Sequence, residues 1–232
     1  MSQNFDKYPL QRCSENEKIA YLSILASICY VDGEFSECER QQLNAFLNDF
    51  NISSEGKREI CSSIFNLSEK NKINYLNIIR NICDTDLNFT LVSDMCLLAL
   101  SDSNFSIKEY NYVMEIGENL GITHEQVEAI RTVQENLYKI KDIPSKSKAF
   151  KKIIKECVSK LAGAGVPIGA IAVSGSVFGL SAAGLTSGLA ALGALVGGGM
   201  LAGTVFVVPA IAAGSVYGVK KLFDVIWKDK EE

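Results

Sequence analysis

Apolar residues recur every three or four positions through residues 14–141, with polar residues between them. This spacing places the apolar side chains on one face of an α-helix. The segment contains no proline and only four glycines, so few positions interrupt a helix. The pattern predicts about six or seven helices and no sheet, and therefore an all-α fold. Two clear series are Ile19, Leu22, Leu25, Ala26 and Cys29, and Ile73, Leu76, Ile79 and Ile82.

Capping boxes mark where several of these helices begin. In a capping box, Ser or Thr is followed three residues later by Glu or Gln, and each side chain accepts a hydrogen bond from the other residue's backbone N–H. The sequence therefore predicts helix starts directly after positions 14, 36, 106 and 123. The four boxes are Ser14–Glu17, Ser36–Glu39, Ser106–Glu109 and Thr123–Gln126.

The same pattern occurs twice along the chain. The frame D-x-x-F-S-x-x-E covers residues 32–39 and again residues 102–109, and the apolar positions that follow coincide without a gap. Two such units packed face to face would bury one core, so the sequence predicts a duplicated helical bundle over residues 1–141. The coinciding pairs are Leu43 and Val113, Phe46 and Ile116, Phe50 and Leu120, Ile52 and Ile122, and Ile60 and Ile130.

Residues 142–160 predict a linker followed by a basic amphipathic helix. Pro144 and its polar neighbours interrupt the helical pattern, and residues 146–160 then hold six lysines and one glutamate. Two interpretations of the helix, residues 147–160, stay open. It packs against the globular domain, or its lysines are attracted to an anionic lipid surface. Its apolar face comprises Phe150, Ile153, Ile154, Cys157 and Leu161.

The long run from Leu161 to Val219 contains no charged residue and no histidine, and it holds all but four of the 18 glycines. About 20 residues cross a bilayer core, so the run has room for two spans and a turn. Lysines flank it on both sides, which places both ends in the cytoplasm. The sequence predicts a transmembrane helical hairpin within residues 161–227, with spans at 166–185 and 200–219, and a charged tail at 228–232.

Small residues recur every four positions in this run, for example at Gly165 and Gly169 and at Gly199 and Gly203. Such ridges let membrane helices approach closely, so the hairpin is predicted to contact the lipid bilayer and to self-associate. The alternative is a glycine-rich helical hairpin inside a soluble fold. That alternative leaves few charges to cover the outer face of the hairpin.

Composition and charge narrow the classes of function. A net charge of −4 argues against a nucleic-acid binder, which needs a basic face. The seven cysteines form no CxxC pair, which fits reduced thiols in a cytosolic compartment. No apolar signal region begins the chain, so the N-terminal part is expected in the cytoplasm. His124 is the sole histidine, and there is neither a phosphate loop nor a nucleophile–base pair, so we predict no catalytic residues and no enzyme.

The repeated frame resembles the TerB-like family, a helical domain associated with tellurite resistance and related stress systems. The family signature is an apolar helix ending in A-x-A-D-G, followed by x-(I/F)-S-x-x-E, and it is repeated in the second half. Residues 28–39 match it well. Residues 99–109 keep the Asp and the Glu but have Ser103 in place of the glycine. The resemblance covers approximately residues 14–140.

This resemblance implies a divalent-cation site built from the two acidic turns, with calcium or magnesium as the metal. Asp32 and Glu39 would serve the first half, and Asp102 and Glu109 the second. The alternative is structural, because the glutamates stand at capping positions and the aspartates follow helix ends. The missing glycine at position 103 would leave a single working half-site.

The glycine-rich run, at residues 163–219, is similar to the interferon-induced 6-16 family, which is membrane-associated and has no enzymatic chemistry. The similarity rests on residues 179–191 and 197–203. Together the segments predict a non-catalytic sensor or scaffold at the bacterial inner membrane, with its N-terminal domain in the cytoplasm, in a stress-response or phage-defence system. The second hypothesis is a membrane-permeabilising effector whose sheltered hairpin inserts and oligomerises on triggering.

Overall fold

The computed structural model describes residues 9–103, 105–140, 143 and 147–174, and within these ranges every regular element is a helix. This confirms the predicted all-α class. The α-helices are α1 (Glu15–Ser27), α2 (Glu37–Asp49), α3 (Ser54–Asn66), α4 (Glu69–Asn81), α5 (Thr85–Ala99), α6 (Ile107–Asn119), α7 (His124–Lys139), α8 (Lys148–Gly163) and α9 (Ile168–Val173). The short 3₁₀ helices of the same ranges are η1 (Pro9–Arg12), η2 (Ile28–Tyr30) and η3 (Leu100–Asp102).

All four predicted capping boxes are present, at the starts of α1, α2, α6 and α7. In each box the Ser or Thr oxygen accepts from the backbone N–H three residues on, and the Glu or Gln side chain accepts in return. Because these bonds join near neighbours in the chain, the helix starts follow from local sequence alone.

Corresponding helices begin at a constant offset along the chain: α1 and α5 at positions 15 and 85, α2 and α6 at 37 and 107, and α3 and α7 at 54 and 124. The turns between them also correspond. Gly33 has a φ of +101° and Ser103 one of +69°, while Asn51 and Gly121 have +52° and +77°. The left-handed backbone is therefore kept at both places although only one residue of each pair is glycine.

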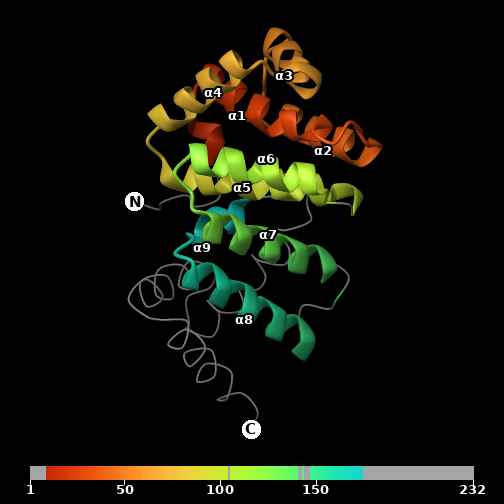
Figure 1. Ribbon diagram of the computed structural model, residues 1–232, viewed down its shortest axis with the longest axis vertical. Coiled ribbons are helices and arrows are strands. Elements are labelled where there is room, and N and C mark those ends of the chain that lie inside the picture. The colour runs from red at the N-terminus through yellow and green to blue at the C-terminus, as the bar shows by residue number, and fades with distance from the viewer. Residues whose placement is uncertain (1–8, 104, 141–142, 144–146, 175–232) are drawn as a thin grey trace.

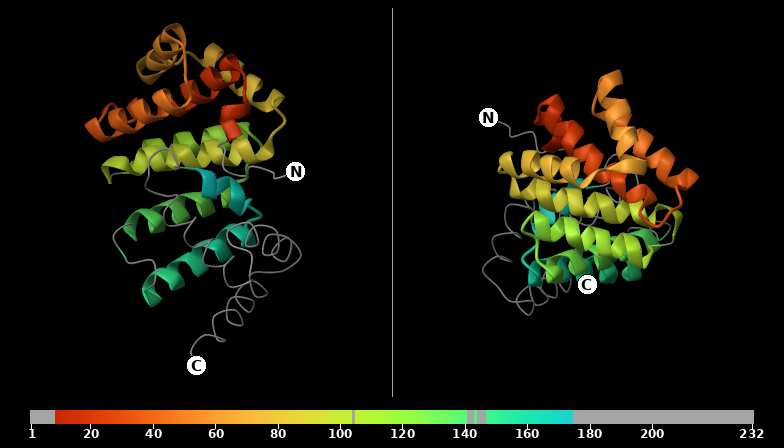
Figure 2. Two further views of the ribbon diagram at one scale, coloured as in Figure 1. Left: turned by 180° about the vertical axis from the view of Figure 1, so that it is seen from behind. Right: turned by 45° about the horizontal axis from the view of Figure 1, so that its top comes forward.

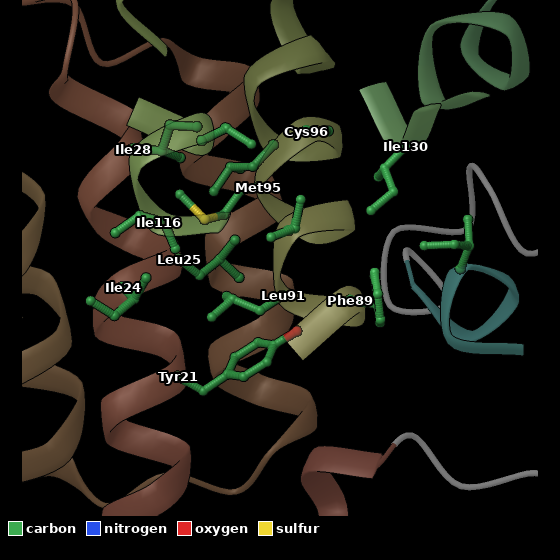
Figure 3. Packing of buried hydrophobic residues seen from close by; sticks show 14 of the residues in the cluster. Tyr21, Ile24, Leu25, Ile28, Phe89, Leu91, Met95, Cys96, Ile116 and Ile130 are labelled. Carbon is green, nitrogen blue, oxygen red and sulfur yellow. The ribbon is translucent and has the colours of Figure 1, made fainter. Parts of the chain in front are cut away.

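The helices form layers around α5. Figure 1 shows α1–α4 at one end of the described part, α5 and α6 across its middle, and α7, α8 and α9 at the other end. Helix α5 contacts α1, α2, α6, α7 and α9, and twelve of its fifteen residues are buried, so it is the central element of the core. Figure 3 shows side chains of α1 such as Tyr21 and Leu25 beside Leu91 and Met95 of α5.

The predicted basic helix is α8, and it packs against α7 through the apolar face that the sequence indicates. Phe150, Ile154, Cys157 and Leu161 are buried and Ile153 is partly buried, in the same core cluster as the apolar residues of α1–α7. The first of the two interpretations of this helix, packing against the globular domain, is what the structure shows.

The beginning of the charge-free run also belongs to this core. Val166, Ile168 and Ile171 are buried, and α9 lies between α5 and α8 (Figure 2). In the part of the chain that the structure describes, none of the helices has both the length and the apolar character needed to cross a membrane. Residues 175–232, which hold most of the predicted hairpin and the charged tail, lie outside the described residues.

Candidate acidic site

The two acidic turns lie against each other, because each contacts the helix that follows the other. Helix α2 contacts η3, and α6 contacts η2. Lys108, at the start of α6, donates a hydrogen bond from Nζ to the backbone oxygen of Asp32, with an N–O distance of 3.2 Å. The fold therefore brings the two halves of the predicted site to one place, although they are far apart in the sequence.

Glu39 and Glu109 cap the helices that they begin, as the structural interpretation predicts. The backbone N–H of Ser36 donates to Oε2 of Glu39 at 2.8 Å, and that of Ser106 donates to Oε2 of Glu109 at 2.7 Å. Both side chains are buried, with Glu39 exposed by 4% and Glu109 by 3%. The capping bonds use Oε2 in each residue and leave Oε1 outside the box.

The surroundings of both buried glutamates disfavour the charged form of the carboxyl group. Burial raises the pKa of Glu109 to about 7, against opposing hydrogen bonds from Ser106, and the charges of Asp32 and Glu39 raise it further. Burial also raises the pKa of Glu39, with added repulsion from Asp102 and Asp32. Asp32 therefore acts electrostatically on both glutamates and Asp102 acts on Glu39, which sequence spacing alone does not show.

The two aspartates are more accessible than the glutamates. Asp32 is partly buried, and its Oδ1 accepts from the backbone N–H of Glu34 at 3.0 Å, which closes a small turn. Asp102 is exposed at the end of η3. Since Ser103 keeps the left-handed conformation of Gly33, the lost glycine does not remove the turn from the second half.

Two residues that the sequence interpretation did not select border these carboxylates. Lys108 brings a positive charge to the backbone of Asp32. Cys29 lies buried in η2, and burial, together with the charges of Glu39 and Glu109, raises the pKa of its thiol well above the usual value. The one sequence feature that could have predicted this location of Cys29 is its position on an apolar helix face, three residues before Asp32.

Within residues 9–103, 105–140 and 147–174, no three His, Cys, Asp or Glu side chains are grouped so as to hold a metal ion. The donor chemistry still fits a hard cation, because carboxylate oxygens are its preferred ligands. Cation binding at Asp32, Glu39, Asp102 and Glu109 therefore stays a prediction.

The helices that carry both acidic turns match a known family. The family model described as "Tellurite resistance protein TerB" matches residues 18–132, from the first turn of α1 to the middle of α7. Residues 18–132 belong to the TerB family. The resemblance inferred from the repeated frame is thereby confirmed. No curated protein and no solved structure matches the chain.

The TerB match encloses the whole acidic site. All four predicted cation ligands lie inside it, and all three pairs of corresponding helices fall at least partly inside it. Helices α8 and α9 fall outside it, although they share its core. The TerB domain of this chain thus has an additional layer formed by residues 148–174.

Proposed function

We propose that this protein is a non-catalytic sensor or scaffold in a bacterial stress-response or phage-defence system. Its TerB domain lies in the cytoplasm, and the charge-free run that ends at residue 219 tethers it to the inner membrane. The observation that carries the proposal is the meeting of two acidic turns, one from each half of the TerB domain, at which the neighbouring carboxylates repel the charged forms of the buried Glu39 and Glu109.

The equal spacing of three pairs of helices supports a duplicated bundle. In a duplicated bundle the acidic turns are equivalent, and a cation between them contacts both halves at once. Calcium or magnesium would relieve the repulsion among the carboxylates and displace the proton that Glu109 retains near neutral pH. Helices α2 and α6 both begin at these turns, so the cation changes the packing of the two halves together.

Calorimetry on the full chain in detergent tests cation binding. Titration of calcium and then of magnesium is expected to give binding heat in the wild type, and an affinity at least tenfold lower when Asp32→Asn and Asp102→Asn are combined. Asp49→Asn is the matched control, because Asp49 is an exposed aspartate at the end of α2. Absence of heat in the wild type with both metals contradicts the cation proposal.

A specific observation favours a second candidate, the membrane-permeabilising effector. The first part of the charge-free run, residues 161–174, is packed in the core with α5 and α7, as expected for a segment that is sheltered before it inserts. Cell fractionation separates the two candidates. Constant recovery in the membrane fraction supports the tether. A soluble form that becomes membrane-bound on triggering, together with leakage of dye from vesicles, supports the effector.

A further inference from the structure

Helix α9 is attached to α5 by buried hydrogen bonds as well as by apolar contacts. Oγ of Ser174 donates to Oδ1 of Asp94 at 2.7 Å. The Thr90 hydroxyl is shared between the backbone oxygen of Asp86 in α5 itself, at 2.8 Å, and the backbone oxygen of Ala170, at 3.2 Å. The hydroxyl of Tyr21 donates to the other oxygen of Asp94 at 2.6 Å, and Figure 3 shows this ring reaching from α1 toward α5. Thr90, Asp94 and Ser174 are all fully buried.

The polar residues that meet α9 are specific to the second half of the bundle. When the sequences of the two copies of the repeated pattern are aligned, Thr90 corresponds to Ala20 and Asp94 to Ile24. Ala20 and Ile24 are buried on α1, which packs against α3 and α4. A buried hydroxyl or carboxyl group is unfavourable unless it is hydrogen-bonded, so an apolar pair is the simpler solution for a permanent core. The polar pair, Thr90 and Asp94, occurs in the copy of the pattern that contacts residues 168–174.

We propose that the face of α5 that carries Thr90 and Asp94 is a docking surface for residues 168–174 of the same chain, and that this segment binds there reversibly. The TerB domain thereby holds the first part of the charge-free run and releases it. The biological consequence of release, which is that the run becomes free to enter a bilayer, rests on the proposed function. The docking itself does not depend on the proposed function.

The geometry of α9 supports reversible binding. The helix has six residues, which is too short for a stable helix without tertiary contacts. It follows a turn at Gly165, where φ is +70°, and Pro167 precedes its first residue, so it is separated from α8 by a conformational break. After release, water can replace the bond that Ser174 donates to Asp94, and the Thr90 hydroxyl keeps its bond to Asp86. Segments of this kind open as separate units while the remaining core stays folded.

Hydrogen exchange measured by mass spectrometry on the full chain in detergent tests the docking. In the wild type, the amides of α9 are expected to exchange faster than those of α5. Ser174→Ala is expected to speed α9 exchange about tenfold and leave α5 and α7 unchanged, since it removes one docking bond. Thr90→Val, measured separately, is expected to speed α9 exchange by a smaller factor, because its bond to Ala170 is the longer branch of a shared hydroxyl. Thr90→Val keeps the shape of the side chain.

Ser27→Ala is the matched control. It removes the 2.7 Å hydrogen bond between Ser27 and Tyr112, which joins the end of α1 to α6 and does not involve α9. The proposal is overturned if α9 exchanges only as fast as α5 in the wild type, if neither docking variant speeds it, or if Ser27→Ala speeds it equally. Failure of the wild type to bind vesicles contradicts the membrane function and leaves the exchange result standing.

Discussion

At the scale of single residues, Glu109 is under two opposing influences. Its capping bonds to Ser106 favour the carboxylate, whereas burial and the neighbouring acidic residues favour the protonated acid. The balance raises its pKa to about 7, so the charge of the site changes near neutral pH. Glu39 is subject to the same conflict, with a pKa raised by burial.

The raised pKa of Glu109 predicts the pH dependence of stability. Between about 4.5, the ordinary value, and about 7, the folded chain holds a proton that the unfolded chain has lost. The free energy of unfolding therefore decreases as pH rises through this range, by at most about 1.4 kcal/mol per pH unit for one proton. Urea unfolding of the full chain in detergent at several pH values measures the slope.

Glu109→Gln is expected to reduce this slope, because glutamine does not titrate and still offers an oxygen to the capping box. Glu55→Gln, which changes an exposed glutamate in the first turn of α3, should keep the slope of the wild type. If Glu109→Gln retains the full slope, then Glu109 does not hold its proton as described.

The left-handed turns predict a second result at this scale. Ser103 has a φ of +69°, which strains a residue that carries a Cβ. Ser103→Gly should raise the free energy of unfolding by about 0.5–1 kcal/mol, even though it removes the exposed hydrogen bond to Tyr138. Asn51→Gly is the control, because asparagine tolerates this conformation and the change should be near zero. Equal effects of the two substitutions, measured by urea unfolding, would refute the explanation.

At the scale of elements, the chain shows that an amphipathic pattern defines a helix but not its partner. The apolar stripe of residues 147–160 predicts α8, and the flanking lysines favour lipid as much as protein. The structure places the stripe on α7 and leaves Lys152 and Lys160 exposed. The apolar face of α8 is therefore occupied by its own domain.

Leu161→Ala tests the packing of α8. Leu161 is fully buried, so the substitution should lower the free energy of unfolding by about 2–5 kcal/mol. Ile153→Ala, on the partly buried edge of the same helix, should have a clearly smaller effect. Urea unfolding of the full chain gives both values, and a loss below about 1 kcal/mol for Leu161→Ala would mean that α8 does not pack in the core.

At the scale of the whole molecule, the sequence predicted what depends on near neighbours. The capping boxes and the constant offset between the two copies located the helix starts, and the repeated frame identified the TerB domain. Two features depend on contacts between distant residues and were missed. One is the bond between Ser174 and Asp94, which spans 80 positions, and the other is the burial of Glu39 and Glu109.

Hydropathy alone does not distinguish a buried segment of this chain from a membrane span. Charge-free sequence is compatible with a protein core as well as with lipid, because both environments exclude charges. Residues 161–174 satisfy this condition in the core beside α5 and α7. The membrane prediction for the rest of the run, up to residue 219, therefore requires its own test by fractionation.

We infer that the two acidic turns form one cation-responsive unit, and titration of the Glu109 carboxyl group by nuclear magnetic resonance is the decisive experiment. In the full chain without metal, we expect this group to have a pKa of about 7. With saturating calcium or magnesium, the same pKa should decrease, because a nearby cation favours the carboxylate. An identical titration with and without both metals would mean that the acidic turns do not respond to these cations.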